Sequence, residues 1–476
     1  MTAAARPGAA GSLAELEARV AYELQCTQYP DAPWVPAARD ASGRTVHAVL
    51  IVGGGQAGLA LAFALRREGV HDVVVVDRAP EGREGPWITF ARMNTLRTPK
   101  YLTGPDYGVP SLTPRAWFEA THGAAAWDAM DRIPRPTWMA YLQWFRRVTG
   151  VTVRNLTEVT GFRGTAEGFV EVDLRDARGE HTVVARQLVI ANGMDGGGAW
   201  YVPPQFTREL PRARWAHSSE EIDFAALRGA HVAVLGAGAA AFDAAAEALD
   251  HGATVELHHR RPELLQLQFR AWLEQAGFLA AFGDLDDARK WAVMHRLLGV
   301  GAPPPESAVQ RVADRAGFEV RAASAWHALR SDGSGVLIDT SRGERRADFV
   351  VFATGVRFDL SLRPEFASLV PVAALWRDRF VPPPAQACEE VGLFPYLGRG
   401  FELTERSPGA APWLARVRMF NYAATASLGI TGASGTGLKL GLRRLVGSLV
   451  RALYLQCADQ HVAALPWPQG THAAPE

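Results

Sequence analysis

Cysteine is scarce in this chain, and its placement excludes two kinds of chemistry. The 476 residues include three cysteines, Cys26, Cys388 and Cys457, which lie far apart and form no CxxC or CxxxxC pair. A redox-active dithiol needs such a pair, and so does a metal site built from cysteines that are close in sequence. We therefore expect neither kind of centre in this protein.

Charge of one sign, long apolar runs and an export signal are also missing. Lys+Arg and Asp+Glu each total 50, so no basic surface predicts nucleic-acid binding. No run reaches the roughly 20 apolar residues that a membrane helix needs, and residues 1–20 lack the apolar core of a signal peptide. The chain is nevertheless 48% hydrophobic, which is enough for buried cores in two or three domains. We expect a cytoplasmic protein with neither a membrane nor a nucleic-acid partner.

One sequence pattern occurs twice, at residues 48–77 and 231–260. The first copy reads AVLIVGGGQAGLALAFALRREGVHDVVVVD and the second reads HVAVLGAGAAAFDAAAEALDHGATVELHHR. Each copy has an apolar strand, a glycine cluster, an alanine-rich helix and a second apolar strand. A unit of this kind binds a dinucleotide with its pyrophosphate at the N-terminus of the helix. An ordinary strand-to-helix turn would explain one copy alone, but two complete copies favour two dinucleotide-binding domains.

Small residues recur at three positions of each glycine cluster. The first permits a tight turn, the second lets the backbone approach a pyrophosphate, and the third lets the helix pack closely against the strand. We assign these positions to cofactor binding, together with one glutamine: Gly53, Gly55, Gln56 and Gly58 in the first copy, and Gly236, Gly238 and Ala241 in the second.

The last residues of the two copies carry opposite charges. Asp77 and Arg260 occupy equivalent positions, where such a unit meets the adenosine ribose of its dinucleotide. An acidic side chain accepts hydrogen bonds from a free ribose hydroxyl, whereas Arg260 followed by Arg261 suits a ribose that carries a 2′-phosphate. The pattern therefore predicts that the first unit binds FAD and that the second binds NADPH.

Two apolar strands that end in small residues flank the second copy. They read LVIANG at residues 188–193 and FVVFATG at residues 349–355, and we assign Thr354 and Gly355 to cofactor binding. Unrelated strand ends would look the same, but their placement favours a chain that leaves the first domain and later returns to it.

The predicted fold is therefore α/β, with two Rossmann-like domains and the NADPH domain inserted into the FAD domain. The predicted boundaries are a partly disordered lead-in at 1–44, the FAD domain at 45–195, a linker at 196–227, the NADPH domain with a helical segment at 228–345, the rest of the FAD domain with a C-terminal helix at 346–465, and a tail at 466–476.

Periodicity predicts several further elements. Helices are expected at 12–25, 137–148, 264–298 and 437–455, and an antiparallel meander at 151–155, 169–176 and 181–193. The aromatic residues of the third helical stretch favour a packed core over a substrate pocket. The adjacent His258 and His259 point to opposite faces of a strand, so we expect no metal site there.

Four features together resemble the class B flavoprotein monooxygenases, a family that includes Baeyer–Villiger monooxygenases and amine N-hydroxylases. These features are GGGQAG, Gly85-Pro86-Trp87, the His217-Ser218 pair and the FATG strand end. The resemblance extends over about residues 46–455, and it implies that Trp87 binds a cofactor and that His217 is a catalytic candidate. The glycine that the Baeyer–Villiger fingerprint carries between its Phe and His is absent between Phe206 and His217, which argues against that chemistry.

Two shorter segments are similar to the N-hydroxylases. They are MNTLRTPK at residues 93–100 and PRPTWMAYLQW at residues 134–144. In this family the first segment lies near the flavin ring, which makes Arg97 a second catalytic candidate. An always-charged guanidinium in that place could hold a peroxide anion or a carboxylate. Pairing with a structural aspartate explains Arg97 equally well.

The resemblance implies a reaction in which the cofactors do most of the chemistry. Hydride would pass from NADPH to FAD, and a C4a-(hydro)peroxyflavin would transfer one oxygen atom from O2 to a small-molecule substrate, with N-hydroxylation preferred. There are two alternatives. One is an NAD(P)H-dependent flavin reductase that passes electrons to a quinone or a protein carrier, and the other is a non-catalytic flavin-binding protein.

Overall fold

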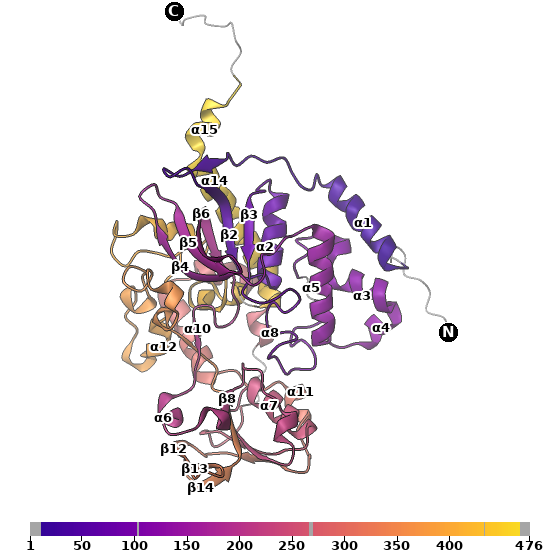
Figure 1. Cartoon of the computed structure of the whole chain (residues 1–476), viewed down its shortest axis with the longest axis vertical. Coiled ribbons are helices and arrows are strands. Elements are labelled where there is room, and N and C mark those ends of the chain that lie inside the picture. The colour runs from indigo at the N-terminus through magenta and orange to yellow at the C-terminus, as the bar shows by residue number, and fades with distance from the viewer. Residues whose placement is uncertain (1–10, 102–103, 266–269, 433, 467–476) are drawn as a thin grey trace, which may run out of the picture.

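Two parallel sheets, one around each copy of the repeated pattern, form the framework of the protein. The computed structural model describes residues 11–101, 104–265, 270–432 and 434–466. The first sheet and its helices lie at one end of the molecule, and the second sheet lies at the other (Figure 1). The predicted α/β class, with one dinucleotide-binding domain inserted into another, is confirmed.

The first sheet begins with the strand, helix and strand of the first copy. These are β2 (Thr45–Val52), α2 (Gln56–Arg67) and β3 (Val73–Val76). β2 lies between β3 and β6 (Gly179–Ile190), and the three strands are parallel. The apolar strand residues are buried because α2 covers them with an apolar face that includes Phe63. β17 (Val417–Met419) also pairs with β6 in the parallel direction, so the C-terminal part of the chain re-enters this sheet.

An antiparallel meander extends the first sheet from β6. Its other strands are β5 (Val170–Asp176) and β4 (Glu158–Gly164), while β1 (Ala38–Arg39) pairs antiparallel with β2. The prediction of a meander strand at 151–155 was wrong. The backbone of Arg154 instead bonds to Val75 and Asp77 and makes an isolated parallel bridge at the end of β3.

Further helices share the hydrophobic core of the first sheet and α2. They are α1 (Leu13–Cys26), α3 (Pro114–His122), α4 (Ala124–Ala129), α5 (Arg135–Thr149) and α14 (Gly435–Gln456). The helices predicted at 12–25, 137–148 and 437–455 are confirmed. Ser12 caps α1, whose Leu16, Val20 and Leu24 are buried in the core, so this part of the predicted lead-in belongs to the packed domain.

The second sheet is built around β9 (His231–Leu235), α7 (Ala239–Asp250) and β10 (Thr254–His258). Its five strands are all parallel and follow the order β11 (Phe318–Arg321), β10, β9, β15 (Phe349–Phe352) and β8 (Trp215–His217). One face packs against α7 and α11 (Glu306–Gln310). The other face packs against an antiparallel sheet of β12 (Trp326–Ser331), β13 (Val336–Thr340) and β14 (Gly343–Ala347).

The positions of β15 and β8 correct the predicted domain boundaries. We expected residues 349–352 in the returning FAD domain and residues 215–217 in the linker, but both strands belong to the second sheet. A short apolar strand suits any buried parallel sheet, so its partner is decided by contacts outside the local pattern. The two domains are joined through the antiparallel pair β7 (Gly198–Trp200) and β16 (Val356–Phe358), and the return to the first sheet comes at β17.

A helical segment of the insertion reaches back into the core of the first domain. α10 (Asp287–Val300) packs Trp291 against Trp376, with 6.2 Å between the ring centroids, and Trp291 is 2% exposed. Trp291 therefore belongs to a packed core, as expected, but to the core of the other domain. Trp272 is 55% exposed, and Phe269 lies outside the described residues.

Six short helices complete the description: α6 (Pro204–Thr207), α8 (Arg270–Leu273), α9 (Ala276–Ala281), α12 (Glu389–Gly392), α13 (Thr425–Leu428) and α15 (Ala458–Ala463). α15 extends away from the body of the molecule (Figure 1). Among the described residues, no helix combines the length and the apolar character that crossing a bilayer requires. Residues 1–10 and 467–476, which belong to the predicted lead-in and tail, lie outside the described part of the chain.

Candidate functional site

The first glycine turn forms an open cradle at the start of α2. Gly53 has a φ of +112°, and a Cβ on it would lie 2.5 Å from the carbonyl oxygen of Ala191. A Cβ on Gly58 would lie 1.8 Å from the carbonyl oxygen of Gly53, whereas a Cβ on Gly55 would meet no described atom within 4 Å. No side chain caps the N-terminus of α2. The turn therefore presents free backbone N–H groups to an open face, which suits a pyrophosphate.

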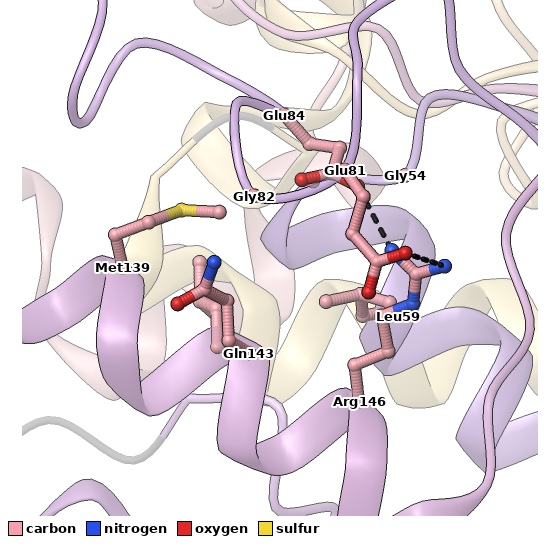
Figure 2. A pocket seen from close by; sticks show the side chains of 10 residues that line it. Gly54, Leu59, Glu81, Gly82, Glu84, Met139, Gln143 and Arg146 are labelled. Carbon is pink, nitrogen blue, oxygen red and sulfur yellow. Dashed lines mark hydrogen bonds and ion pairs between the residues drawn. The ribbon is translucent and has the colours of Figure 1, made fainter. Parts of the chain in front are cut away.

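A pocket lies directly beside this cradle (Figure 2). Its lining residues come from the glycine turn and α2, from the loop after β3, and from α5: Gly54, Gly55, Leu59, Glu81, Gly82, Glu84, Met139, Leu142, Gln143 and Arg146. Arg146 donates to the buried Glu84 carboxylate over 3.0 Å and pairs with Glu81 over 3.7 Å. These ion pairs hold the loop against α5 and thereby shape one wall of the pocket.

Asp77 lies at the glycine turn, as the repeated pattern predicts. One carboxylate oxygen accepts a hydrogen bond from the backbone N–H of Gly54, and the other accepts one from Ala79, both over 2.7 Å. The side chain therefore fixes the turn in addition to standing where a ribose is expected. Gln56, at the start of α2, and Trp87 both contact Trp138 of α5.

The second glycine turn repeats the geometry of the first. Gly236 has a φ of +140°, and a Cβ on it would lie 2.5 Å from the carbonyl oxygen of Ala353. Ala241 is fully buried at the third position, and no side chain caps the N-terminus of α7. Gly238 differs from Gly55, because a Cβ on it would lie 3.0 Å from the carbonyl oxygen of Ala302. The second cradle is therefore partly covered by the segment that follows α10.

The two arginines at the end of the second copy have different surroundings. Arg260 is exposed, and it makes no hydrogen bond or ion pair with the side chains and backbone that the structure describes. Arg261 donates to the carbonyl oxygens of Val300 (2.9 Å) and Gly299 (2.6 Å) at the end of α10. Arg260 is thus available to a phosphate, whereas Arg261 holds the segment that covers Gly238.

Thr354 and Gly355 lie at the junction of the two domains. The Thr354 hydroxyl donates to the carbonyl oxygen of Tyr201, and the Tyr201 N–H donates to the carbonyl oxygen of Gly355 over 2.9 Å. Both residues follow β15, beside the second glycine turn. Any contact that they make with a cofactor would therefore be made from the second sheet, and not from the first as the sequence suggested.

His217 ends β8 and is 2% exposed. Its Nδ1 lies 2.7 Å from the Ser219 hydroxyl, its ring packs against Trp200, and its Nε2 is buried without a hydrogen-bond partner among the described atoms. Burial lowers the pKa of His217 to about 4, so the imidazole is neutral near pH 7. A neutral imidazole in this place can donate or accept one hydrogen bond with a ligand, but it supplies no positive charge.

Arg97 pairs with Asp243, which favours the structural alternative for this residue. Asp243 belongs to α7 and is 5% exposed, and its second oxygen lies 3.4 Å from the guanidinium of Arg311. Burial raises the pKa of the Asp243 carboxyl, and the two guanidinium groups oppose that rise. Arg97 therefore joins a first-domain segment to the helix that starts at the second glycine turn.

Further arginines that the sequence analysis missed connect Arg97 with the loop after His217. Arg311 donates to the carbonyl oxygen of Arg92 over 2.8 Å, and Arg92 donates to the carbonyl oxygens of Ser218 and Glu220. Burial lowers the pKa of Arg92 to about 10, which still leaves it charged. The two catalytic candidates therefore belong to one polar network between the domains. The sequence offered one sign of this network. Asp243 is the one acidic residue in the apolar AAAFDAAA stretch of α7.

The architecture and the two glycine turns define a two-domain dinucleotide-binding fold, with one glycine turn in each domain. Ornithine hydroxylase from Pseudomonas aeruginosa has the same fold, with a TM-score of 0.67 and 16% identity, over 86% of this chain and 100% of that one. The ornithine N-hydroxylase of Kutzneria sp. 744 was solved with reduced FAD, NADP+ and L-ornithine. It matches with a TM-score of 0.66 and 18% identity, over 85% of this chain and 99% of that one. A flavin-containing monooxygenase from Stenotrophomonas maltophilia matches with a TM-score of 0.51 and 21% identity, over 87% of this chain and 99% of that one.

Sequence comparison identifies the family. The model for pyridine nucleotide-disulphide oxidoreductases matches residues 47–277. The FAD-dependent urate hydroxylase of Xanthomonas campestris pv. campestris is 43% identical over 474 residues, which covers 97% of this chain and 99% of that protein. This chain belongs to the flavoprotein monooxygenase family that includes that urate hydroxylase. It is therefore an oxidoreductase of an FAD-dependent family.

Proposed function

We propose that this protein is an NADPH-dependent FAD monooxygenase that hydroxylates urate or a closely similar oxopurine. The observation that carries the proposal is the 43% identity to a urate hydroxylase over almost the whole length of both chains. The overall reaction balances as substrate, O2, NADPH and H+ giving hydroxylated substrate, water and NADP+. The two electrons of the hydride thus reduce the second oxygen atom to water.

The geometry fits the cofactors that the proposal requires. In this proposal the first turn and Asp77 hold FAD, and the second turn and Arg260 hold NADPH, since both turns present uncapped helix N-termini. When bound, the flavin receives hydride from NADPH and activates O2. The protein's own contribution is to align the two dinucleotides, to exclude water and to orient the substrate.

Positive charge at the junction of the domains supports an anionic substrate such as urate. Four guanidinium groups interact there with the carboxylates of Asp243 and Glu247, and they belong to Arg92, Arg97, Arg135 and Arg311. Asp250 also pairs with Arg311, so four guanidinium groups face three carboxylates, and the remaining positive charge favours an anionic ligand. Neutral His217 adds a hydrogen-bonding group at the same junction.

Oxygen insertion is tested directly with the purified flavin-loaded protein. We expect urate to accelerate NADPH oxidation and O2 uptake, and we expect isotope-labelled O2 to place one labelled oxygen atom in the product. L-Ornithine and L-lysine are the matched controls, since they test the N-hydroxylation that the short similar segments favour. Stimulation by either amine, with a hydroxylamine product and no effect of urate, would replace urate hydroxylation by N-hydroxylation.

The same preparation tests the two other functions. Rapid reoxidation of the flavin with release of peroxide, without oxygen transfer to any of these substrates and with a quinone as the better acceptor, would identify a reductase. A flavin that NADPH does not bleach would identify a binding protein without turnover. Protein that takes up no FAD would contradict all three functions.

A further inference from the structure

Asp243 is a buried carboxylate that its own helix does not need for packing. The residues around it in α7 are small or apolar and fill the core of the second domain, whereas Asp243 faces the first domain. Removing a carboxylate from water is costly unless charged or hydrogen-bonding partners replace the lost hydration. A buried acid in this position therefore indicates an interaction that matters to how the domains meet.

The partners of Asp243 lie on both sides of the domain junction. One oxygen pairs with Arg97 of the first domain, and the other lies 3.4 Å from Arg311 of the second. The Arg97 segment is held firmly in the first domain, because the Leu96 N–H donates to the carbonyl oxygen of Ile133 over 2.8 Å. The ion pair consequently connects the helix of the second glycine turn to a fixed part of the first domain.

A second connection runs parallel to this one. Arg311 donates over 2.8 Å to the carbonyl oxygen of Arg92, five positions before Arg97 on the same first-domain segment. Arg92 in turn donates to Ser218 and Glu220, in the loop that follows β8. Two links from one short segment, one to α7 and one to the β8 loop, fix a relative orientation as well as a distance.

Hydride transfer is very sensitive to such an arrangement. The reacting atoms must come within about 3–3.5 Å, and a displacement of about 1 Å can cost on the order of 100-fold in rate. In the proposed function, α7 begins at the turn that holds NADPH, while the partner segment belongs to the flavin domain. The position of α7 against that segment therefore sets the distance between hydride donor and acceptor.

We propose that Asp243 is a positioning residue that aligns the NADPH domain with the FAD domain for hydride transfer, acting through Arg97 and Arg311. This inference rests on the proposed function, since it assigns the two cofactors to the two units. It gives Arg97 a role in domain alignment in place of direct contact with the reacting atoms.

The test compares Asp243→Asn with Asp250→Asn in the FAD-loaded protein. Asp250 belongs to α7, as Asp243 does, and it pairs with Arg311 and Arg315. Its side chain, however, is 49% exposed. In anaerobic rapid mixing at saturating NADPH, we expect the rate constant for flavin reduction to fall about 10- to 100-fold in Asp243→Asn. We expect no change in Asp250→Asn. FAD content and the Kd for NADP+, measured by calorimetry, should change less than about twofold in both variants.

A readout that does not depend on turnover accompanies this test. Hydrogen exchange in residues 92–97 and 218–220 should become faster in Asp243→Asn and should stay unchanged in Asp250→Asn. Arg311→Lys keeps the charge but loses the two-pronged contact, so it should give a smaller fall in the same rate constant. This conservative variant also provides the answer if Asp243→Asn does not fold.

An unchanged reduction rate in Asp243→Asn would overturn the proposal, and so would a weaker NADP+ affinity with a normal rate at saturation. The proposed function fails in a different way, because the unmodified protein would then either transfer no oxygen to urate or keep its flavin unreduced by NADPH. Hydrogen exchange would still report whether Asp243 aligns the two domains.

Discussion

The two glycine turns share a backbone and differ in their neighbours. Gly53 and Gly236 both have positive φ angles, and each would bring a Cβ to 2.5 Å from the carbonyl oxygen of a neighbouring strand end. At the middle position Gly55 faces open space, whereas Gly238 lies under Ala302. At the third position the first turn has Gly58 in contact with the turn itself, and the second has Ala241. In the first domain the glycine turn is packed tightly against its own helix at Gly58. In the second domain the turn is packed against the segment around Ala302.

The charged residues at the ends of the two copies also differ in how they are used. Asp77 is bonded to its own turn through Gly54 and Ala79, while Arg260 is exposed to solvent. The first site thus has its end residue arranged before a ligand arrives. The second site keeps its end residue free and uses the neighbouring Arg261 for structure.

The largest effect on cofactor binding is expected where the two turns differ at the third position. Gly58→Ala would place a methyl group 1.8 Å from a backbone oxygen that has little freedom to move. Overpacking of this kind costs about 1–3 kcal/mol and occasionally more, so we expect loss of FAD and of soluble protein. Absorbance of bound flavin per mole of protein measures the effect. Ala241→Gly in the second turn is the matched control and should retain FAD, and equal losses in the two variants would mean that the turns do not differ.

The second domain should be the acid-sensitive one. His217 and His258 are both buried there, and burial lowers the pKa of each from 6.5 to about 4. Between these pH values the unfolded chain binds more protons than the folded chain, so stability is complete above pH 6.5 and falls as the pH drops toward 4. Each histidine accounts for up to about 3 kcal/mol of that loss.

Thermal unfolding followed at a series of pH values tests this expectation. His217→Gln should flatten the decline between pH 6.5 and 4, whereas replacement of the exposed His327 by Gln should leave it unchanged. An identical pH profile for His217→Gln and the unmodified protein would show that His217 is not the group responsible.

Exchanging charge for a neutral amide at the end residues should affect one cofactor at a time. Arg260→Gln should weaken NADPH by about 1–3 kcal/mol and spare NADH, because a charge-assisted hydrogen bond to the 2′-phosphate is lost. Asp77→Asn should lower FAD retention and leave the preference for NADPH unchanged. Calorimetric titration with NADP+ and NAD+, together with flavin content, measures both. If the preference did not move in Arg260→Gln, the assignment of the second site would be wrong.

The smallest effect is expected from Arg261→Gln, and it should have a different character. Arg261 is engaged with the carbonyl oxygens of Gly299 and Val300, so its loss should loosen the segment over Gly238 and alter NADPH and NADH binding equally, by roughly 1 kcal/mol. The ratio of the two affinities is the quantity to measure. A selective loss of NADPH binding would instead make Arg261 a phosphate ligand.

Much of the fold followed from local patterns in the chain. The repeated unit, the helices at 13–26, 135–149 and 435–456, and the insertion of one domain into another were all predictable, because helical periodicity and glycine conformations act over a few residues. The strand at 349–352 was predicted as a strand but placed in the wrong sheet. Its pairing with β9 depends on residues more than 100 positions away, which a local pattern does not specify.

The candidate site shows the same division. The amino-acid sequence alone established the glycine turns, the opposite charges at their ends and the family, since these depend on residue type and spacing. Folding decided that Arg97 meets Asp243, that Arg261 meets the end of α10, and that His217 is buried and neutral. An ion pair or a shifted pKa depends on which distant segments come into contact and on how much water they exclude, and this is settled only when the two domains pack together.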